Sequence, residues 1–338
     1  GEGIHGDDTS SPRRGSSRLV IGTGYVGLVS GACFAEFGVN VTCADIDEEK
    51  IQRLEKGQIP FYEPGLSEKV KANVAQGRLG FTTAVAAAIH DALVVFIAVG
   101  TPANPAGTPN LDAIEAVARQ IGRNLSDYKV VVTKSTVPPR TGERVRSIIE
   151  AEAEEGAEFD VVSNPEFLRE GTAIDDFMHP DRVVIGASSR RALEAIIDVY
   201  RPLYQSDVPM VLTDVHSAEM IKYASNAMLA AKISLINEIA NICEAFGADV
   251  TAVARGMGLD ERIGPRSLSA GAGYGGSCFP KDVTGLAATA ASRGIDTPAL
   301  GDTRNRVVDG RRGDAGGRRV STKQSTAVLE NNEPLHSQ

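Results

Sequence analysis

The sequence predicts an α/β protein in which a Rossmann-like, doubly wound domain precedes a helical domain with one long helix. Three observations lead to this fold class. Short apolar runs alternate with helical stretches up to about residue 205. A glycine-rich turn, GTGYVG, separates the first apolar run from the first helical stretch. Residues 217–246 then carry apolar side chains at helical spacing, without glycine or proline.

The elements of the first domain follow from this alternation. The continuous apolar runs, such as LVVFIAV, have strand length and are typical of parallel strands buried on both faces. Gly38 is the expected stop of the first helix, and a charged helix follows the second strand through residue 56. Strands are expected at residues 18–21, 39–44, 93–99, 130–133, 161–162 and 183–185, and other helices at residues 25–37, 111–125 and 139–154.

The second domain begins with the long helix. At a rise of ~1.5 Å per residue it would extend about 45 Å, so we expect it to bridge domains or build a dimer interface. A helix at residues 250–257, a glycine-rich loop at 269–282 and a helix from Lys281 to Ser292 follow. The predicted divisions are a disordered tail at 1–17, a Rossmann-like domain with the glycine-rich turn at 18–205, a helical central domain at 206–300 and a disordered tail at 301–338.

Composition excludes several classes of function. The chain of 338 residues has a net charge of −9, which disfavours nucleic-acid binding, and no apolar run approaches the length of a membrane span. The polar N-terminal segment lacks the apolar region of a secretory signal. The four cysteines contain no C-x-x-C pair and share no metal-ligand spacing with the five histidines, so no metal is expected. We therefore expect a cytoplasmic protein with reduced thiols.

The glycine-rich turn is a candidate dinucleotide site. Its first two glycines allow a tight turn beside a pyrophosphate, and its third allows the helix to pack on the strand. Asp45 ends the second predicted strand, where an acid binds the adenosine ribose hydroxyls and disfavours a 2′-phosphate, so NAD is the expected cofactor. The turn reads Gly22-Thr23-Gly24-Tyr25-Val26-Gly27.

Cys278 differs from the other three cysteines. Cys33, Cys43 and Cys243 lie in apolar stretches and are expected to pack in the core. Cys278 follows a run of glycines and lies just before a predicted helix, whose N-terminal dipole and Lys281 would both favour a thiolate. The sequence therefore indicates a candidate nucleophile at this position.

Five motifs resemble those of the UDP-glucose/GDP-mannose dehydrogenase family, and the resemblance runs from about residue 18 to about residue 298. IPFYEPGL and GYGGSCFPKD are most similar to the members that oxidise UDP-glucose, whereas related N-acetylmannosamine dehydrogenases usually carry His where this chain has Ser277. The motifs are GTGYVGL at 22–28, EPGL at 63–66, STVP at 135–138, NPEFLREG at 164–171 and GYGGSCFPKD at 273–282.

The resemblance implies a reaction and a set of catalytic residues. A primary alcohol of UDP-glucose would be oxidised twice with NAD, through a thiohemiacetal and a thioester on Cys278. Lys222 and Asn226, one helical turn apart, would stabilise the developing oxyanion, and Glu166 would be the acid/base for thioester hydrolysis. Two further catalytic residues are implied: Asp282, which would order the water or Lys222, and Thr136, which would contact NAD and the water.

The same resemblance implies binding residues and a homodimer. Arg262 would reach the substrate of the neighbouring subunit. The cofactor would be contacted by Gly22, Gly24, Tyr25, Val26, Gly27, Asp45, Lys50, Thr101, Thr136, Glu170 and Lys281. The substrate would be contacted by Glu166, Phe167, Leu168, Glu170, Lys222, Asn226, Arg262, Tyr274 and Gly275.

Two departures from the family pattern leave alternatives open. Ser269 stands where the family usually has a lysine for the nucleotide phosphates, and the family continues past residue 300 with a third, Rossmann-like domain. The activity of this polypeptide alone is therefore open, and a fragment, a frameshifted reading or a decayed gene would each explain the tail. The competing hypotheses are a GDP-mannose 6-dehydrogenase, a single-step β-hydroxyacid dehydrogenase, and an inactive NAD-binding or dimer-partner protein.

Overall fold

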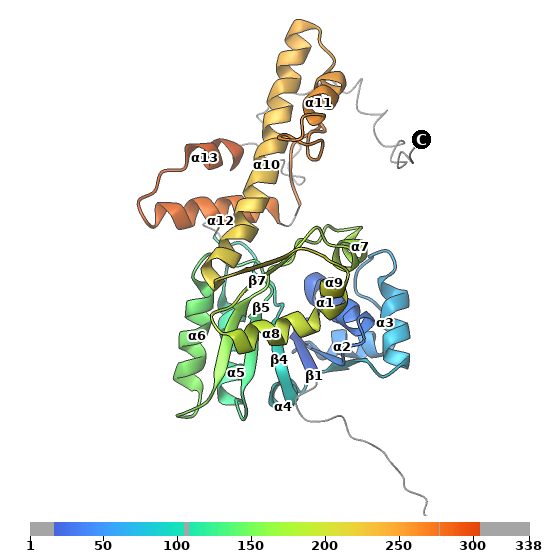
Figure 1. Ribbon diagram of the computed structural model, residues 1–338, viewed down its shortest axis with the longest axis vertical. Helices are drawn as coiled ribbons and strands as arrows, with labels where there is room; N and C mark the ends of the chain where they lie inside the picture. The colour runs from blue at the N-terminus through green and yellow to red at the C-terminus, as the bar shows by residue number, and fades with distance from the viewer. Residues whose placement is uncertain (1–16, 105–107, 277, 305–338) are drawn as a thin grey trace, which may run out of the picture. The chain divides into compact units, whose positions relative to one another are not determined.

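A computed structural model of the chain describes residues 17–104, 108–276 and 278–304. These residues divide into two compact units, and the division falls after Lys222, within a long helix. Figure 1 shows both units. The tails expected to be disordered lie almost entirely outside the described residues.

The first unit contains an eight-stranded sheet in the order β3-β2-β1-β4-β5-β6-β7-β8, counted over the described residues. All pairs from β3 to β6 are parallel, β6 and β7 are antiparallel, and β7 and β8 are parallel again. The order reverses between β1 and β4, which is the doubly wound topology that the sequence predicts. The strands are β1 Ser17–Ile21, β2 Val41–Ala44, β3 Leu79–Thr82, β4 Ala92–Ile97, β5 Lys129–Thr133, β6 Phe159–Ser163, β7 Val183–Gly186 and β8 Met210–Thr213.

Helices cover both faces of this sheet (Figure 1). Because successive side chains of a strand point to opposite faces, β4 contributes Val94 and Phe96 to one core cluster and Val95 and Ile97 to the other. The first cluster includes residues of α1, α3, α7 and α8, and the second includes residues of α4, α5 and α6. The helices are α1 Tyr25–Glu36, α2 Glu48–Glu55, α3 Leu66–Ala75, α4 Val85–Asp91, α5 Asp112–Arg123, α6 Thr141–Glu152, α7 Ala173–Met178, α8 Arg190–Val199 and α9 Arg201–Gln205.

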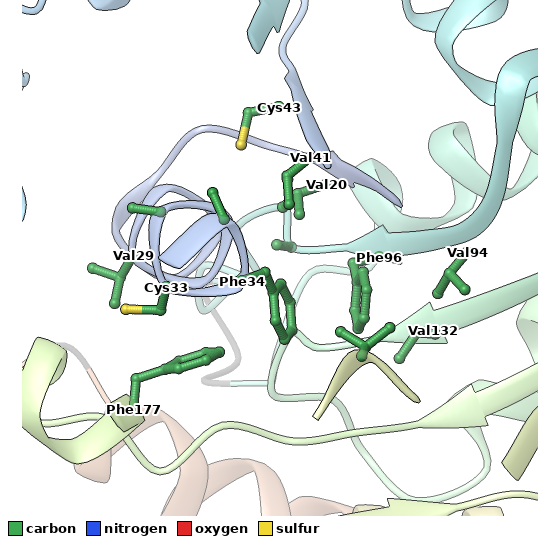
Figure 2. Packing of buried hydrophobic residues seen from close by; sticks show 14 of the residues in the cluster. Val20, Val29, Cys33, Phe34, Val41, Cys43, Val94, Phe96, Val132 and Phe177 are labelled. Atoms are coloured by element: carbon green, nitrogen blue, oxygen red, sulfur yellow. The ribbon is translucent and has the colours of Figure 1, made fainter. Parts of the chain in front are cut away.

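An aromatic cluster fills the α1 side of the sheet. The ring centroids of Phe34 and Phe96 are 4.8 Å apart, and those of Phe34 and Phe177 are 5.2 Å apart. Figure 2 shows these rings beside Cys33 and the valines of β1 and β4. Cys33 and Cys43 are fully buried here and Cys243 is buried in the other unit, as expected for core cysteines.

The second unit is helical. It contains α10 Val215–Phe246 from Tyr223 onward, α11 Val250–Gly258, α12 Phe279–Ala291 and α13 Pro298–Arg304. Its small core includes Ala230, Tyr274 and Val283, and the Tyr274 hydroxyl donates to the carbonyl of Thr303 at 2.9 Å. Regular structure thus continues past Leu300, where the sequence pattern was expected to stop. None of the described helices combines the length and hydropathy needed to cross a membrane.

Candidate active site

The glycine-rich turn joins β1 to α1, as the sequence predicts, and its geometry explains the glycines. Gly22 has φ of +101°, and a Cβ there would lie 2.8 Å from the carbonyl oxygen of Ala98. A Cβ on Gly27 would lie 1.9 Å from the carbonyl oxygen of Gly22, so the helix approaches the turn closely. At Gly24 a Cβ would meet no described atom within 4 Å.

This open space is where a dinucleotide would fit. Gly24 is the N-cap of α1 and has no side chain to satisfy the first N–H groups of the helix. Such N–H groups bind phosphate well. The turn therefore fits the pyrophosphate of NAD.

Asp45 lies at the end of β2, beside this turn. Its Oδ2 atom accepts hydrogen bonds from Thr23 N at 2.9 Å, from Thr23 Oγ1 at 2.7 Å and from Lys50 Nζ at 3.0 Å. Burial alone would raise the pKa of Asp45, but these hydrogen bonds and one from the Asp47 N–H outweigh it, so the pKa lies below its usual value. The structure brings together Asp45 and Lys50, which were both predicted at the adenosine ribose.

Thr101 and Thr136 also meet, near the carboxyl ends of β4 and β5. Thr101 Oγ1 donates to the carbonyl oxygen of Thr136 at 3.0 Å. The neighbouring Ser135 hydroxyl donates to the carbonyl oxygen of Val99 at 2.6 Å. These contacts fix the STVP turn at the edge of the sheet where dinucleotides bind in doubly wound folds.

Glu166 and Lys222 form a buried ion pair in the first unit. Lys222 Nζ lies 3.3 Å from Glu166 Oε1, and the two side chains are 6% and 7% exposed. Glu166 Oε2 accepts a hydrogen bond from the Leu168 N–H at 2.6 Å, and Lys222 Nζ lies 5.2 Å from the ring centroid of Phe167. The predicted catalytic carboxylate, its cation and two predicted substrate residues therefore form one cluster.

Glu219 anchors the start of α10, one turn before Lys222. Its carboxylate accepts hydrogen bonds from the N–H groups of Arg140 at 2.6 Å and Gly142 at 2.7 Å. Burial raises the pKa of Glu219 to about 7. Sequence reasoning missed this residue, because Glu219 stands among polar residues such as Ser217 and Lys222, and no local pattern marks it as buried.

Lys134 is a second residue that the motifs did not identify. It lies on β5's carboxyl side, 2% exposed, and its Nζ donates to Asn164 Oδ1 at 3.2 Å and to the Tyr200 hydroxyl at 3.1 Å. Asn164 Nδ2 donates in turn to the carbonyl of Val184 at 2.8 Å. Burial lowers the pKa of Lys134 to about 8. This network fixes Asn164, the first residue of the NPEFLREG segment, two residues before Glu166.

The second unit brings together Asn226, Lys281 and Asp282. The buried Asp282 carboxylate accepts hydrogen bonds from Asn226 Nδ2 at 2.6 Å and from Lys281 Nζ at 2.8 Å. Cys278 is the N-cap of α12, is exposed, and its carbonyl accepts the Asp282 N–H at 2.9 Å. The candidate nucleophile thus begins the helix that carries this carboxylate, and α12 starts two residues earlier than expected.

Four other predicted site residues differ in their exposure and partners. Glu170 and Gly275 are exposed. Arg262 is exposed and paired with Asp260 at 2.6 Å. Tyr274 is 3% exposed with its hydroxyl on Thr303, so its side chain serves the core of its unit. Within the described residues, no group of three or more His, Cys, Asp or Glu side chains is arranged to hold a metal ion.

Comparison with known proteins identifies the family domain by domain. Residues 18–204 match the NAD binding domain of the UDP-glucose/GDP-mannose dehydrogenase family, and residues 216–306 match its central domain. The chain is 55% identical over 300 residues to the UDP-glucose 6-dehydrogenase of Rhizobium meliloti strain 1021, covering 86% of this chain and 68% of that protein. It is 54% identical over 275 residues to UDP-glucose 6-dehydrogenase TuaD of Bacillus subtilis strain 168, covering 81% and 59%.

Comparison with solved structures points to the same family. The UDP-glucose dehydrogenase of Pyrobaculum islandicum superposes with a TM-score of 0.83 at 40% identity, covering 90% of this chain and 69% of that one. The GDP-mannose dehydrogenase of Pseudomonas aeruginosa, solved as a ternary complex, has a TM-score of 0.71 at 37% identity, covering 85% and 67%. The chain spans about three fifths to two thirds of the length of its curated relatives. The chain therefore belongs to the UDP-glucose/GDP-mannose dehydrogenase family.

Proposed function

We propose that the chain is an NAD-dependent UDP-glucose 6-dehydrogenase, which oxidises UDP-glucose to UDP-glucuronate in two steps. The observation that carries the proposal is that each unit holds one buried carboxylate bound by a side chain of α10. Glu166 pairs with Lys222 at 3.3 Å, and Asp282 accepts from Asn226 at 2.6 Å. Lys222 and Asn226 are one turn apart on this helix. A base, a cation and an amide donor are what an acyl-enzyme reaction requires.

The first unit would hold the cofactor. The open backbone at Gly24 and the start of α1 would receive the pyrophosphate, while Asp45 and Lys50 would hold the adenosine ribose. Thr101, Thr136 and Glu170 would lie toward the nicotinamide. When bound, NAD accepts the hydride that each oxidation releases.

The chain's own residues would each serve a separate step of the reaction. In the first oxidation, the alcohol loses a proton to a base and a hydride from its carbon. The Cys278 sulfur then adds to the aldehyde carbon while the carbonyl oxygen takes up a proton, which gives a thiohemiacetal. In the second oxidation this intermediate loses its hydroxyl proton and a hydride from carbon, which gives a thioester. Glu166 takes a proton from the attacking water, the C–S bond breaks, and Lys222 and Asn226 donate to the oxygen that carries the charge.

A homodimer through α10 is part of this proposal. Met228, Leu235 and Ile242 are 65%, 55% and 54% exposed and recur every seven residues, which is the spacing of a helix-packing seam. Phe246, 84% exposed, ends the same helix. Sedimentation equilibrium would test this: we expect a dimer, and expect Leu235→Lys to give monomer; a monomeric wild-type chain would contradict the dimer.

Product stoichiometry tests the activity. We expect two NADH per UDP-glucuronate formed, and no UDP-glucuronate from Cys278→Ala, whereas Cys243→Ala, a buried cysteine, serves as the matched control. A Cys278→Ala protein that makes UDP-glucuronate at the normal rate would refute the mechanism. One NADH per substrate would instead indicate a single-step dehydrogenase.

Parallel assays separate the alternatives. Faster turnover of GDP-mannose than of UDP-glucose would move the assignment to the other branch of the family, to which the Pseudomonas aeruginosa structure belongs. A wild-type chain that binds NADH and turns over neither sugar would indicate an inactive NAD-binding protein.

A further inference from the structure

The Glu63 carboxylate, in the EPGL motif, lies between segments that are remote in sequence. It is 5% exposed. Its Oε2 accepts hydrogen bonds from the Tyr25 hydroxyl at 2.5 Å and from the Gly171 N–H at 2.8 Å, and its Oε1 accepts from the Ala173 N–H at 2.8 Å. A carboxylate is costly to bury unless donors satisfy it, and these donors account for its burial.

The turn that carries Glu63 also holds the Tyr25 ring. The Phe61 and Tyr25 ring centroids are 5.1 Å apart. Tyr25 is the first residue of α1 and stands between Gly24 and Gly27 of the dinucleotide turn. Contacts at the ring and at the hydroxyl therefore fix the start of the helix whose N–H groups would face a pyrophosphate.

The other donors to Glu63 follow Glu170, at the end of the NPEFLREG segment. This segment has a separate support, because Asp176 accepts from the Arg169 N–H at 2.8 Å and pairs with the Arg169 guanidinium. Asp176 therefore holds the turn through Arg169, whose carbonyl oxygen lies 3.4 Å from the Tyr25 hydroxyl. Glu63 adds the shorter contact of the Tyr25 hydroxyl, at 2.5 Å, and joins it to the N–H groups of Gly171 and Ala173.

We propose that Glu63 is a positioning residue that fixes Tyr25, and with it the dinucleotide turn, against the segment that follows Glu170. The inference rests on the proposed cofactor site. It adds a role for the EPGL motif: a carboxylate that touches no reacting atom sets the shape of the cofactor loop through Tyr25.

NADH binding to the full chain, followed by fluorescence enhancement of the nicotinamide, tests the link. We expect Glu63→Gln and Tyr25→Phe each to raise the Kd about tenfold, the loss typical of one buried hydrogen-bond partner. The double variant should bind no more weakly than either single variant, because both remove the same contact. Asp176→Asn is the matched control and should keep the wild-type Kd within about twofold.

Tyrosinate absorbance gives a signature that a purely structural role would not produce. Burial, then the hydrogen bond from Tyr25 to Glu63, raises the pKa of Tyr25. Glu63→Gln should therefore let one more tyrosine ionise at lower pH, and this change should vanish in a Tyr25→Phe background.

The outcomes distinguish this inference from the proposed function. If Glu63→Gln and Tyr25→Phe both bind NADH with the wild-type Kd, this inference is overturned and the proposed function is not. Losses of affinity that add in the double variant would have the same consequence. A wild-type chain that binds no NADH would overturn the proposed function and this inference with it. If Glu63→Gln fails to fold, Tyr25→Phe carries the test, and an unchanged Kd there overturns the link.

Discussion

Lys222 and Glu166 form an ion pair in which neither side chain is more than 7% exposed, with 3.3 Å between Nζ and Oε1. Each of these buried charges requires a partner of opposite charge, because an unpaired buried charge is strongly destabilising. The N–H of Leu168 satisfies the second carboxylate oxygen at 2.6 Å. The pair therefore serves stability as well as the proposed chemistry, and the two contributions can be separated.

Lys222→Met should lower the free energy of unfolding by about 3 kcal/mol, because it leaves the Glu166 carboxylate buried without its cation. The double variant Lys222→Met/Glu166→Gln should recover more than half of this loss, since both charges are then gone. Urea denaturation of the wild type, both single variants and the double variant measures the coupling. Losses that simply add would show that the two side chains do not interact.

Asp45→Asn should relax the choice of cofactor. The carboxylate repels a 2′-phosphate, and Lys50, 3.0 Å away, would be released to bind one. We expect the ratio of the NADP to the NAD dissociation constant to fall at least about tenfold, which calorimetric titration can measure. Glu49→Gln, an exposed acid in the first turn of α2, should leave the ratio unchanged. An unaltered ratio in Asp45→Asn would place the ribose elsewhere.

Lys134 predicts a pH dependence of stability. Its pKa falls from 10.5 to about 8 on burial, so the folded state binds fewer protons than the unfolded state between these values. Its contribution to stability is thus fully present above pH 10.5 and is lost as the pH falls through about 8. Across this window, the free energy of unfolding of wild type relative to Lys134→Met should rise with pH by about 3 kcal/mol. A difference that does not change with pH would contradict this.

How much of the fold could be predicted from sequence depended on burial. The runs at 93–99 and 130–133 are strands Ala92–Ile97 and Lys129–Thr133, because strands buried on both faces must be apolar throughout. The edge strands β3 and β8 were not predicted. Phe81 and Thr82 at the end of β3 are only partly buried, and Val211 and Leu212 of β8 are 39% and 47% exposed. Pairing with a neighbour imposes such strands, which leaves little pattern in the sequence.

The site residues also differ in how far the sequence could predict them. Glycine spacing and the acid after β2 are local signals, so Gly22, Gly27 and Asp45 could be placed in advance. The contact of Glu63 with Tyr25 and that of Lys134 with Asn164 join different segments of the chain. No spacing rule contains them, because the sheet order decides which loops meet.

Two glycines of the dinucleotide turn, Gly24 and Gly27, should respond differently to a methyl group. Gly27→Ala places a Cβ 1.9 Å from the Gly22 carbonyl oxygen, which belongs to the backbone and cannot swing aside, so we expect a loss of about 2–3 kcal/mol in the free energy of unfolding. Gly24→Ala meets no described atom within 4 Å and should change stability by less than about 1 kcal/mol.

NADH affinity should nevertheless fall in Gly24→Ala, because the new methyl group occupies the space through which the backbone approaches the pyrophosphate. Denaturation curves and NADH titrations on both variants separate the two roles. A Gly24→Ala protein with normal affinity would mean that the pyrophosphate does not lie on this turn. A Gly27→Ala protein as stable as wild type would mean that α1 can withdraw from β1 without penalty, and the close packing of helix on strand would then not be what requires glycine there.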